Sequence, residues 1–120
     1  MTSQTLLQPL DYARLAVEAA SEKQASDIVI LDITGVSDFA DYFVILTADS
    51  SRQINVLVED IENTLEDQGS TLHHREGTSA SGWVLLDFGD LIVHLFQQEL
   101  RDFYDILGAW SQGVETVRIQ

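Results

Sequence analysis

The sequence contains no cysteine, which excludes a disulfide framework, a thiolate metal site and a cysteine nucleophile. It is also poor in positive charge: Lys23 is its one lysine, and six basic residues face 20 acidic ones, for a net charge of −14. The arginines are scattered, and so negative a surface repels a phosphate backbone. We therefore expect no direct, specific binding to nucleic acid. The charge favours a basic partner, unless the acidity serves only solubility.

Long apolar runs are absent as well. No segment approaches the ~20 apolar residues that cross a membrane. The first residues, MTSQTLLQPLDYARL, lack the basic start and the apolar stretch of a signal peptide. We expect a cytoplasmic protein with no membrane partner. Apolar residues nevertheless make up 45% of the 120-residue chain, which is enough for one domain with its own core.

Hydrophobic periodicity predicts alternating helices and strands. The expected helices lie at about 10–24, from Ser50 to Gly69 and at 100–107, and the expected strands at 27–33, 42–47, 83–88, 91–96 and 114–119. Residues 34–41 and 70–82 are interpreted as loops. The order α-β-β-α-β-β-α, with no repeat or linker, indicates an α/β fold of one domain with a mixed sheet.

The helix after Ser50 gives the clearest local signal. Ser50 and Gln53 have the spacing of a capping box, in which the serine oxygen accepts a free backbone N–H and the glutamine reaches back. Apolar residues then recur at helical spacing from Ile54 to Leu65. Gly69 is a natural left-handed stop.

A two-residue turn at Gly89-Asp90 predicts a hairpin of type II′. This turn places Phe88 opposite Leu91 and makes one face of the hairpin wholly apolar, as a core face should be. The other face combines large aromatic residues with a few polar ones: Trp83, Leu85, Asp87, Ile92, His94 and Phe96. Such a mixture is typical of protein-binding surfaces. The alternative is that a helix covers this face and His94 is a satisfied buried histidine.

Signals for chemistry are weak. His73 and His74 are adjacent and lack the further ligands that a metal needs. Ser50 and Ser51 open a helix, where phosphates are sometimes bound, but no glycine-rich pattern surrounds them. We predict no catalytic residues, no metal site and no cofactor.

Several blocks of the sequence form an ordered pattern: Ser37–Ile45 (SDFADYFVI), Ser50–Gln53 (SSRQ), Trp83–Asp90 (WVLLDFGD), Val93–Phe96 (VHLF), Arg101–Asp105 (RDFYD) and Trp110. Together these blocks closely resemble the ribosomal silencing factor family (RsfS, also called Iojap). The resemblance covers about residues 10–111, so we treat 1–120 as a single domain of this family with its core there. Ala48-Asp49 replace the usual Gly-Thr, and ILGAW replaces the usual Leu-Glu-x-Leu-Trp ending.

The resemblance implies a small α/β domain related to the nucleotidyltransferase fold but without its catalytic acids, and hence not an enzyme. Family members bind a protein of the large ribosomal subunit, number fourteen, at the subunit interface. They thereby obstruct joining of the small subunit and repress translation, notably when nutrients run short. Relatives in mitochondria and plastids act on organelle ribosomes, and the lack of a transit peptide here fits the bacterial role better.

Together, the resemblance and the hairpin face predict these partner-binding residues: Glu76, Trp83, Leu85, Asp87, His94, Phe96 and Tyr104. We expect Asp87 and Glu76 to meet basic groups, and Trp83 and Phe96 to anchor the partner. One alternative is a nucleotide-binding or nucleotidyltransferase-like enzyme using Ser50, Ser51 and Asp87, although Leu85 stands where the second metal-binding acid belongs. Another is a homodimer of the free protein through the same apolar face.

Overall fold

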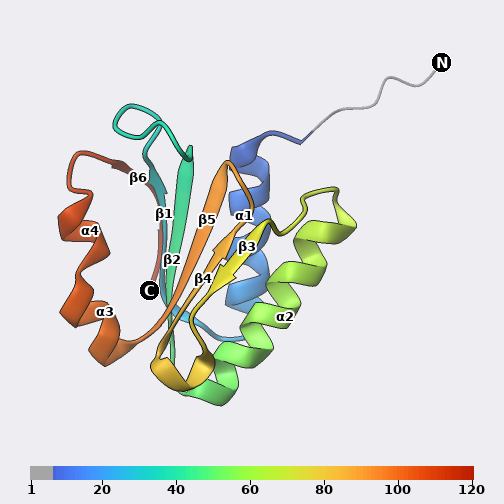
Figure 1. The fold of residues 1–120 in the computed structure, drawn as a ribbon, viewed down its shortest axis with the longest axis vertical. Helices are drawn as coiled ribbons and strands as arrows, with labels where there is room; N and C mark the ends of the chain where they lie inside the picture. The colour runs from blue at the N-terminus through green and yellow to red at the C-terminus, as the bar shows by residue number, and fades with distance from the viewer. Residues whose placement is uncertain (1–6) are drawn as a thin grey trace.

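The computed structural model describes residues 7–120, which form one mixed sheet with helices on both faces (Figure 1). In chain order the elements are α1 (Pro9–Glu22), β1 (Ser26–Asp32), β2 (Tyr42–Ala48), α2 (Ser51–Asp67), β3 (His74–Glu76), the 3₁₀ turn η1 (Ser79–Ser81), β4 (Trp83–Asp87), β5 (Leu91–Gln97), α3 (Gln98–Tyr104), α4 (Ile106–Ala109) and β6 (Val114–Ile119). The α/β class, the mixed sheet and the predicted order of the main elements are confirmed.

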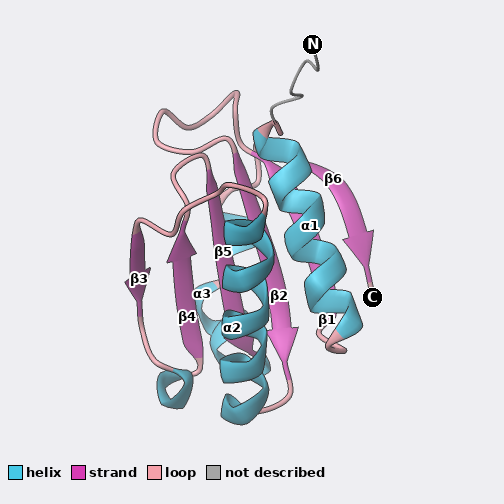
Figure 2. Ribbon diagram, turned by 90° about the vertical axis from the view of Figure 1, so that its right-hand side faces the viewer, coloured by secondary structure: helices cyan, strands magenta, loops and turns pink. Residues whose placement is uncertain are grey.

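The sheet has the order β3-β4-β5-β2-β1-β6. Strands β2 and β5 are parallel, and the other neighbouring strands are antiparallel. Helices α1 and α2 cover one face and α3 with α4 covers part of the other, as Figure 2 shows with α1 and α2 in front of the sheet and α3 behind it.

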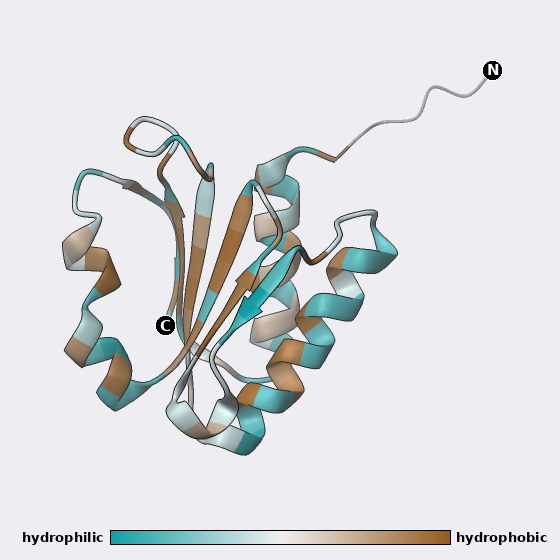
Figure 3. Cartoon of the chain, viewed as in Figure 1, coloured by the Kyte–Doolittle hydropathy of each residue, from teal (hydrophilic) through white to brown (hydrophobic). Residues whose placement is uncertain are grey.

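The main core lies between the sheet and the pair α1 and α2. The apolar stripe of α2 is fully buried there, including Ile54 and Leu65, and it meets the inward residues of the central strands. Full burial of one such side chain contributes ~1.5–3 kcal/mol. Strand β5 is mostly hydrophobic, whereas β3 at the edge of the sheet is hydrophilic (Figure 3).

The start of α2 is capped by Ser50, whose Oγ accepts a hydrogen bond from the Gln53 backbone N–H at 3.1 Å. The Gln53 side-chain oxygen accepts from the backbone of Asp49, one residue earlier than in a standard capping box. Its amide nitrogen donates to the carbonyls of Lys23 and Gln24. One glutamine therefore joins the start of α2 to the turn between α1 and β1.

The hairpin register is confirmed: Phe88 donates its backbone N–H to the Leu91 carbonyl at 2.9 Å, and Trp83 lies opposite Phe96. Gly89 has a φ of +94°, whereas Asp90 has no positive φ, as a type II′ turn requires. The face of Val84 and its neighbours belongs to the main core.

Two expectations need correction. Residues 70–82 are not only loop, because they contain the short edge strand β3 and the turn η1. The single helix expected at 100–107 is two short helices, because Asp105 takes a left-handed conformation with φ +44° and its carboxylate accepts the Gly108 N–H. Aspartate tolerates this conformation better than most residues.

Within residues 7–120 no helix has both the length and the apolarity of a membrane-spanning segment.

Candidate protein-binding face

The second face of the sheet, on the side of α3 and α4, carries a smaller aromatic and aliphatic core. Leu31, Ile33, Phe43, Ile45, Ile92 and Phe96 are buried there, packed against side chains of α3 and α4. A helical layer thus covers the part of this face formed by β5, β2 and β1. His94 is buried, as the alternative expected, but it is not a fully satisfied histidine, because its Nε2 has no hydrogen-bond partner.

Near β3 and β4 the same face stays open and forms a hollow of about 260 Å³. We call it the Trp83 cup, and it is lined by Glu76, Gly77, Ser81, Trp83, Leu85, Leu100 and Tyr104. The cup combines β4, the end of β3 and one side of α3. It therefore brings together four of the predicted partner-binding residues from three separate elements.

The Trp83 ring is the central side chain of the cup, and three neighbours hold it. It stacks on Phe96 with ring centroids 4.9 Å apart and an interplanar angle of 24°, and it lies 4.6 Å from the Tyr104 ring. Its indole Nε1–H donates to Nδ1 of His94 at 3.3 Å. A ring fixed on several sides is a preorganised contact, which lowers the entropy cost of binding.

The expectation that His94 and Phe96 touch a partner directly needs correction. Phe96 is 0% exposed and His94 is 4% exposed, because the sheet, the Trp83 ring and the layer of α3 and α4 enclose them. Burial also lowers the pKa of His94 from 6.5 to about 4, so the imidazole is neutral near pH 7. Both side chains lie beneath the candidate binding face, where they pack against Trp83.

The two predicted acidic contacts differ in their surroundings. Glu76 is exposed at the edge of the cup and lies 3.1 Å from the His74 ring nitrogen. Asp87 is half-buried, and its carboxylate accepts the backbone N–H of Gly89 at 2.7 Å inside the hairpin turn. Glu76 is therefore accessible to solvent beside His74, whereas Asp87 also holds the turn.

Sequence reasoning missed three residues of this face. Leu100 lines the cup, His74 pairs with Glu76, and Phe103 is 78% exposed beside Tyr104, with ring centroids 5.0 Å apart. Exposed large aromatics beside a hollow are a signal for protein binding. An assignment of β3 as a strand would have placed His74 and Glu76 on the face of Asp87 and Leu85, their cross-strand partners.

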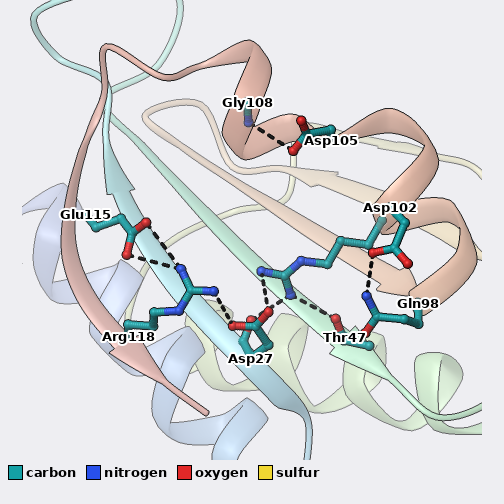
Figure 4. Close-up of polar contacts among 9 residues, drawn as sticks. Asp27, Thr47, Gln98, Asp102, Asp105, Gly108, Glu115 and Arg118 are labelled. Carbon is teal, nitrogen blue, oxygen red and sulfur yellow. Dashed lines mark hydrogen bonds and ion pairs between the residues drawn. The ribbon is translucent and has the colours of Figure 1, made fainter.

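A buried arginine fixes the position of α3, which supplies Leu100 and Tyr104 to the cup. Arg101 is 7% exposed and donates to the Asp27 carbonyl at 2.6 Å and to the Thr47 hydroxyl at 2.8 Å. Its guanidinium also lies 3.3 Å from the Asp27 carboxylate, which binds Arg118 on its other side (Figure 4). Burial lowers the pKa of Arg101, and the Asp27 charge opposes that shift.

The residues of the enzymatic alternative have structural roles in this fold. Ser50 caps α2, and Asp87 holds the hairpin turn with Leu85 at the expected second position. Across residues 7–120, no three acidic or histidine side chains gather as metal ligands do.

Comparisons with known proteins agree on one family. Residues 7–120 match the family described as "Ribosomal silencing factor during starvation". The chain is 34% identical over 113 residues to the ribosomal silencing factor RsfS of Halalkalibacterium halodurans, covering 94% of this chain and 92% of that one. It is 36% identical over 97 residues to the chloroplastic protein Iojap of Zea mays, covering 81% of this chain and 42% of that protein.

A more distant relative and a solved structure extend the comparison. The mouse protein named "Mitochondrial assembly of ribosomal large subunit protein 1" is 26% identical over 100 residues, covering 81% of this chain and 44% of that protein. A crystal structure of a protein from Chromobacterium violaceum has a TM-score of 0.84 at 30% identity and covers 88% of each chain.

Proposed function

Because the chain belongs to the ribosomal silencing factor family, we propose that it binds the large ribosomal subunit through ribosomal protein number fourteen at the subunit interface. A protein bound there prevents the small subunit from joining and so represses translation. Its action requires occupancy of a surface and no chemical step. The name of the mouse relative refers to assembly of a large subunit, which supports the large subunit as the partner.

The observation that carries this proposal is the open Trp83 cup on an otherwise covered face. Trp83, Leu85, Leu100 and Tyr104 give it an apolar interior, and Glu76 adds a negative charge at its edge. Aromatic anchors in a central hollow with a polar rim are the usual layout of an interface hot spot. We assign the direct contacts to Glu76, Trp83, Leu85 and Tyr104. Asp87 lies on the same face, at the end of β4 next to the hairpin turn.

The charge of the molecule fits a basic partner. At −14 the chain attracts a protein rich in lysine and arginine, which raises the association rate at low salt. Glu76 is the exposed acid that the structure places at the cup itself.

Substitutions in the cup test the proposal by affinity for isolated large subunits. Trp83→Ala and Tyr104→Ala should each weaken binding by about 10- to 30-fold, since hot-spot truncations cost ~2 kcal/mol. Glu76→Lys should weaken binding several-fold through repulsion of a basic partner. Glu59→Lys is the matched control, because Glu59 is exposed on α2 beyond the other face of the sheet.

Wild-type affinity in both aromatic variants would contradict the assignment of the cup. An equal loss of affinity in Glu76→Lys and Glu59→Lys would show that binding depends on the total charge of the protein and not on the position of Glu76. For Asp87 the informative change is Asp87→Asn, which keeps an oxygen to accept the Gly89 N–H and removes the charge.

We also propose self-association of the free protein through the same face, because exposed aromatic side chains such as Tyr104 favour contact with another molecule. A homodimer through the cup would compete with the ribosome for Trp83 and Tyr104. Sedimentation velocity of the free chain tests this, with Tyr104→Ala expected to shift a dimer to monomer.

A further inference from the structure

His94 is an unusual residue for its position. It is 4% exposed and lies among aromatic rings, with Phe43 at 4.7 Å and Phe96 at 6.1 Å between centroids. Its Nε2 is buried without a hydrogen-bond partner, which is costly for a polar atom. An apolar ring would fill the same space without that cost, so packing alone does not favour histidine here.

The one polar contact of the buried ring is directed at the binding face. Nδ1 of His94 accepts the indole N–H of Trp83 at 3.3 Å across the β4–β5 pair. That N–H is the only hydrogen-bond donor of the tryptophan side chain. Without an acceptor beneath it, the indole would satisfy its N–H only by turning it toward water, which would change the orientation of the ring.

The other contacts of Trp83 leave its rotation in the ring plane undetermined. Phe96 and Tyr104 pack against the indole by stacking and tilted contacts, and such contacts tolerate sliding and rotation of the ring. A directional hydrogen bond removes this freedom, because it weakens steeply as its angle bends.

We propose that His94 is a positioning residue for partner binding: its unprotonated Nδ1 fixes the orientation of the Trp83 ring in the cup. This inference rests on the proposed function, since it gives His94 a role beneath the surface that binds the ribosome. It replaces the expected direct contact of His94 with an indirect one. The required tautomer carries its proton on Nε2, which is the atom left without a partner.

Two substitutions at His94 separate hydrogen bonding from packing. His94→Phe keeps an aromatic ring of similar size and removes the acceptor. His94→Asn loses the ring but keeps an oxygen close to the place of Nδ1, so it is the rescuing variant. Val93→Ala is the control for general destabilisation, because Val93 is buried on the opposite face of the same strand.

Two readouts apply to each variant at a temperature where all of them are folded. The first is the solvent-exchange rate of the Trp83 indole proton by NMR, with Trp110 as the internal reference. The second is the affinity for isolated large subunits. We expect His94→Phe to speed indole exchange and to weaken binding about tenfold, in line with the loss of one buried hydrogen bond. His94→Asn should restore most of the slow indole exchange and most of the affinity. Val93→Ala should change neither the exchange rate nor the affinity.

Wild-type affinity in His94→Phe would overturn the positioning role. An equal loss of affinity in His94→Phe and His94→Asn would also overturn it. Trp83→Ala distinguishes this failure from failure of the proposed function. If Trp83→Ala weakens binding and His94→Phe does not, only the role of His94 is wrong. If Trp83→Ala itself binds as the wild type does, the cup is not the docking surface and both proposals fail.

Discussion

Trp83 connects the surface of the molecule to its interior more directly than any other residue of the cup. Its ring lines the hollow, stacks on the buried Phe96 and donates to the buried His94. A change beneath the surface can therefore alter the surface. The geometry of the cup therefore depends on the buried side chains of His94 and Phe96 as well as on the residues that line it.

The burial of His94 predicts a pH dependence of stability. The pKa of His94 is about 4 in the folded protein, against an ordinary value of 6.5. The unfolded chain therefore binds more protons between these values, so the folded state has its full stability above pH 6.5 and loses stability as the pH falls toward 4. The loss is on the order of 3 kcal/mol for a shift of this size.

The measurement is the free energy of unfolding by urea, from pH 7 to pH 4, in the wild type and in His94→Phe. The difference between the two proteins should change across this window, because only the wild type carries the buried imidazole. Parallel pH profiles would contradict the assignment of a neutral, buried His94.

At this scale the sequence predicted the face of the sheet on which a side chain lies better than it predicted the burial of that side chain. Strand alternation placed Trp83 and Leu85 on the correct face, because a period of two is a local property. Whether His94 and Phe96 on the same face are exposed depends on α3 and α4, which pack across it from a later part of the chain. Local pattern contains no information on that packing.

Among the elements, α3 closes one side of the cup with Leu100 and Tyr104. Only seven residues long, it is too short to be stable by itself. Arg101 attaches it to the sheet through three groups on β1 and β2: the Asp27 carbonyl, the Asp27 carboxylate and the Thr47 hydroxyl.

Arg101→Met should lower the free energy of unfolding by about 2–4 kcal/mol, because it leaves Thr47 and Asp27 short of a donor in a largely buried place. The Asp27 side chain is 35% exposed, which keeps the loss toward the lower end. Urea unfolding is the measurement. Arg118→Met is the matched control, since Arg118 pairs with the same carboxylate from a more exposed position and should cost less than ~1 kcal/mol. Equal losses in the two variants would contradict the anchoring role of Arg101.

Helices and strands were predicted correctly where neighbouring residues carried a clear pattern, and they were missed where the sequence carried none. Gly89-Asp90 determined the hairpin register, because few residue pairs fit a type II′ turn. Strand β3 was missed because His74–Glu76 are all exposed and show no apolar alternation. The break at Asp105 was missed because leucine and aromatic spacing continues through it, and only the carboxylate cap on Gly108 ends one helix and starts the next.

At the scale of the whole molecule, the two faces of the sheet have different uses. The side of α1 and α2 holds the main core, and its outer surface is acidic along α2. The other side is only partly covered and ends in the cup. The parallel pairing of β2 with β5 makes this layout possible and joins residues 49 positions apart in the chain, such as Tyr42 and Leu91. The sequence predicted a mixed sheet but not this strand order, because no local pattern specifies a long-range pairing.

Net charge acts on binding at this same scale. The acids on α1 and α2 lie on the other side of the sheet from the cup. They affect a partner through the overall field, which is screened over ~10 Å at 0.1 M salt. Raising the salt should therefore slow association with the large subunit, while the apolar contacts in the cup persist.

The proposed function is tested most directly by co-sedimentation of the purified protein with isolated large subunits, followed by addition of small subunits, at low and at high salt. We predict that the protein binds the large subunit, prevents the formation of joined ribosomes, and binds more weakly at the higher salt. Tyr104→Ala should bind less and should allow joining. Absence of binding at low salt, or binding that leaves subunit joining unchanged, would contradict the proposed silencing function.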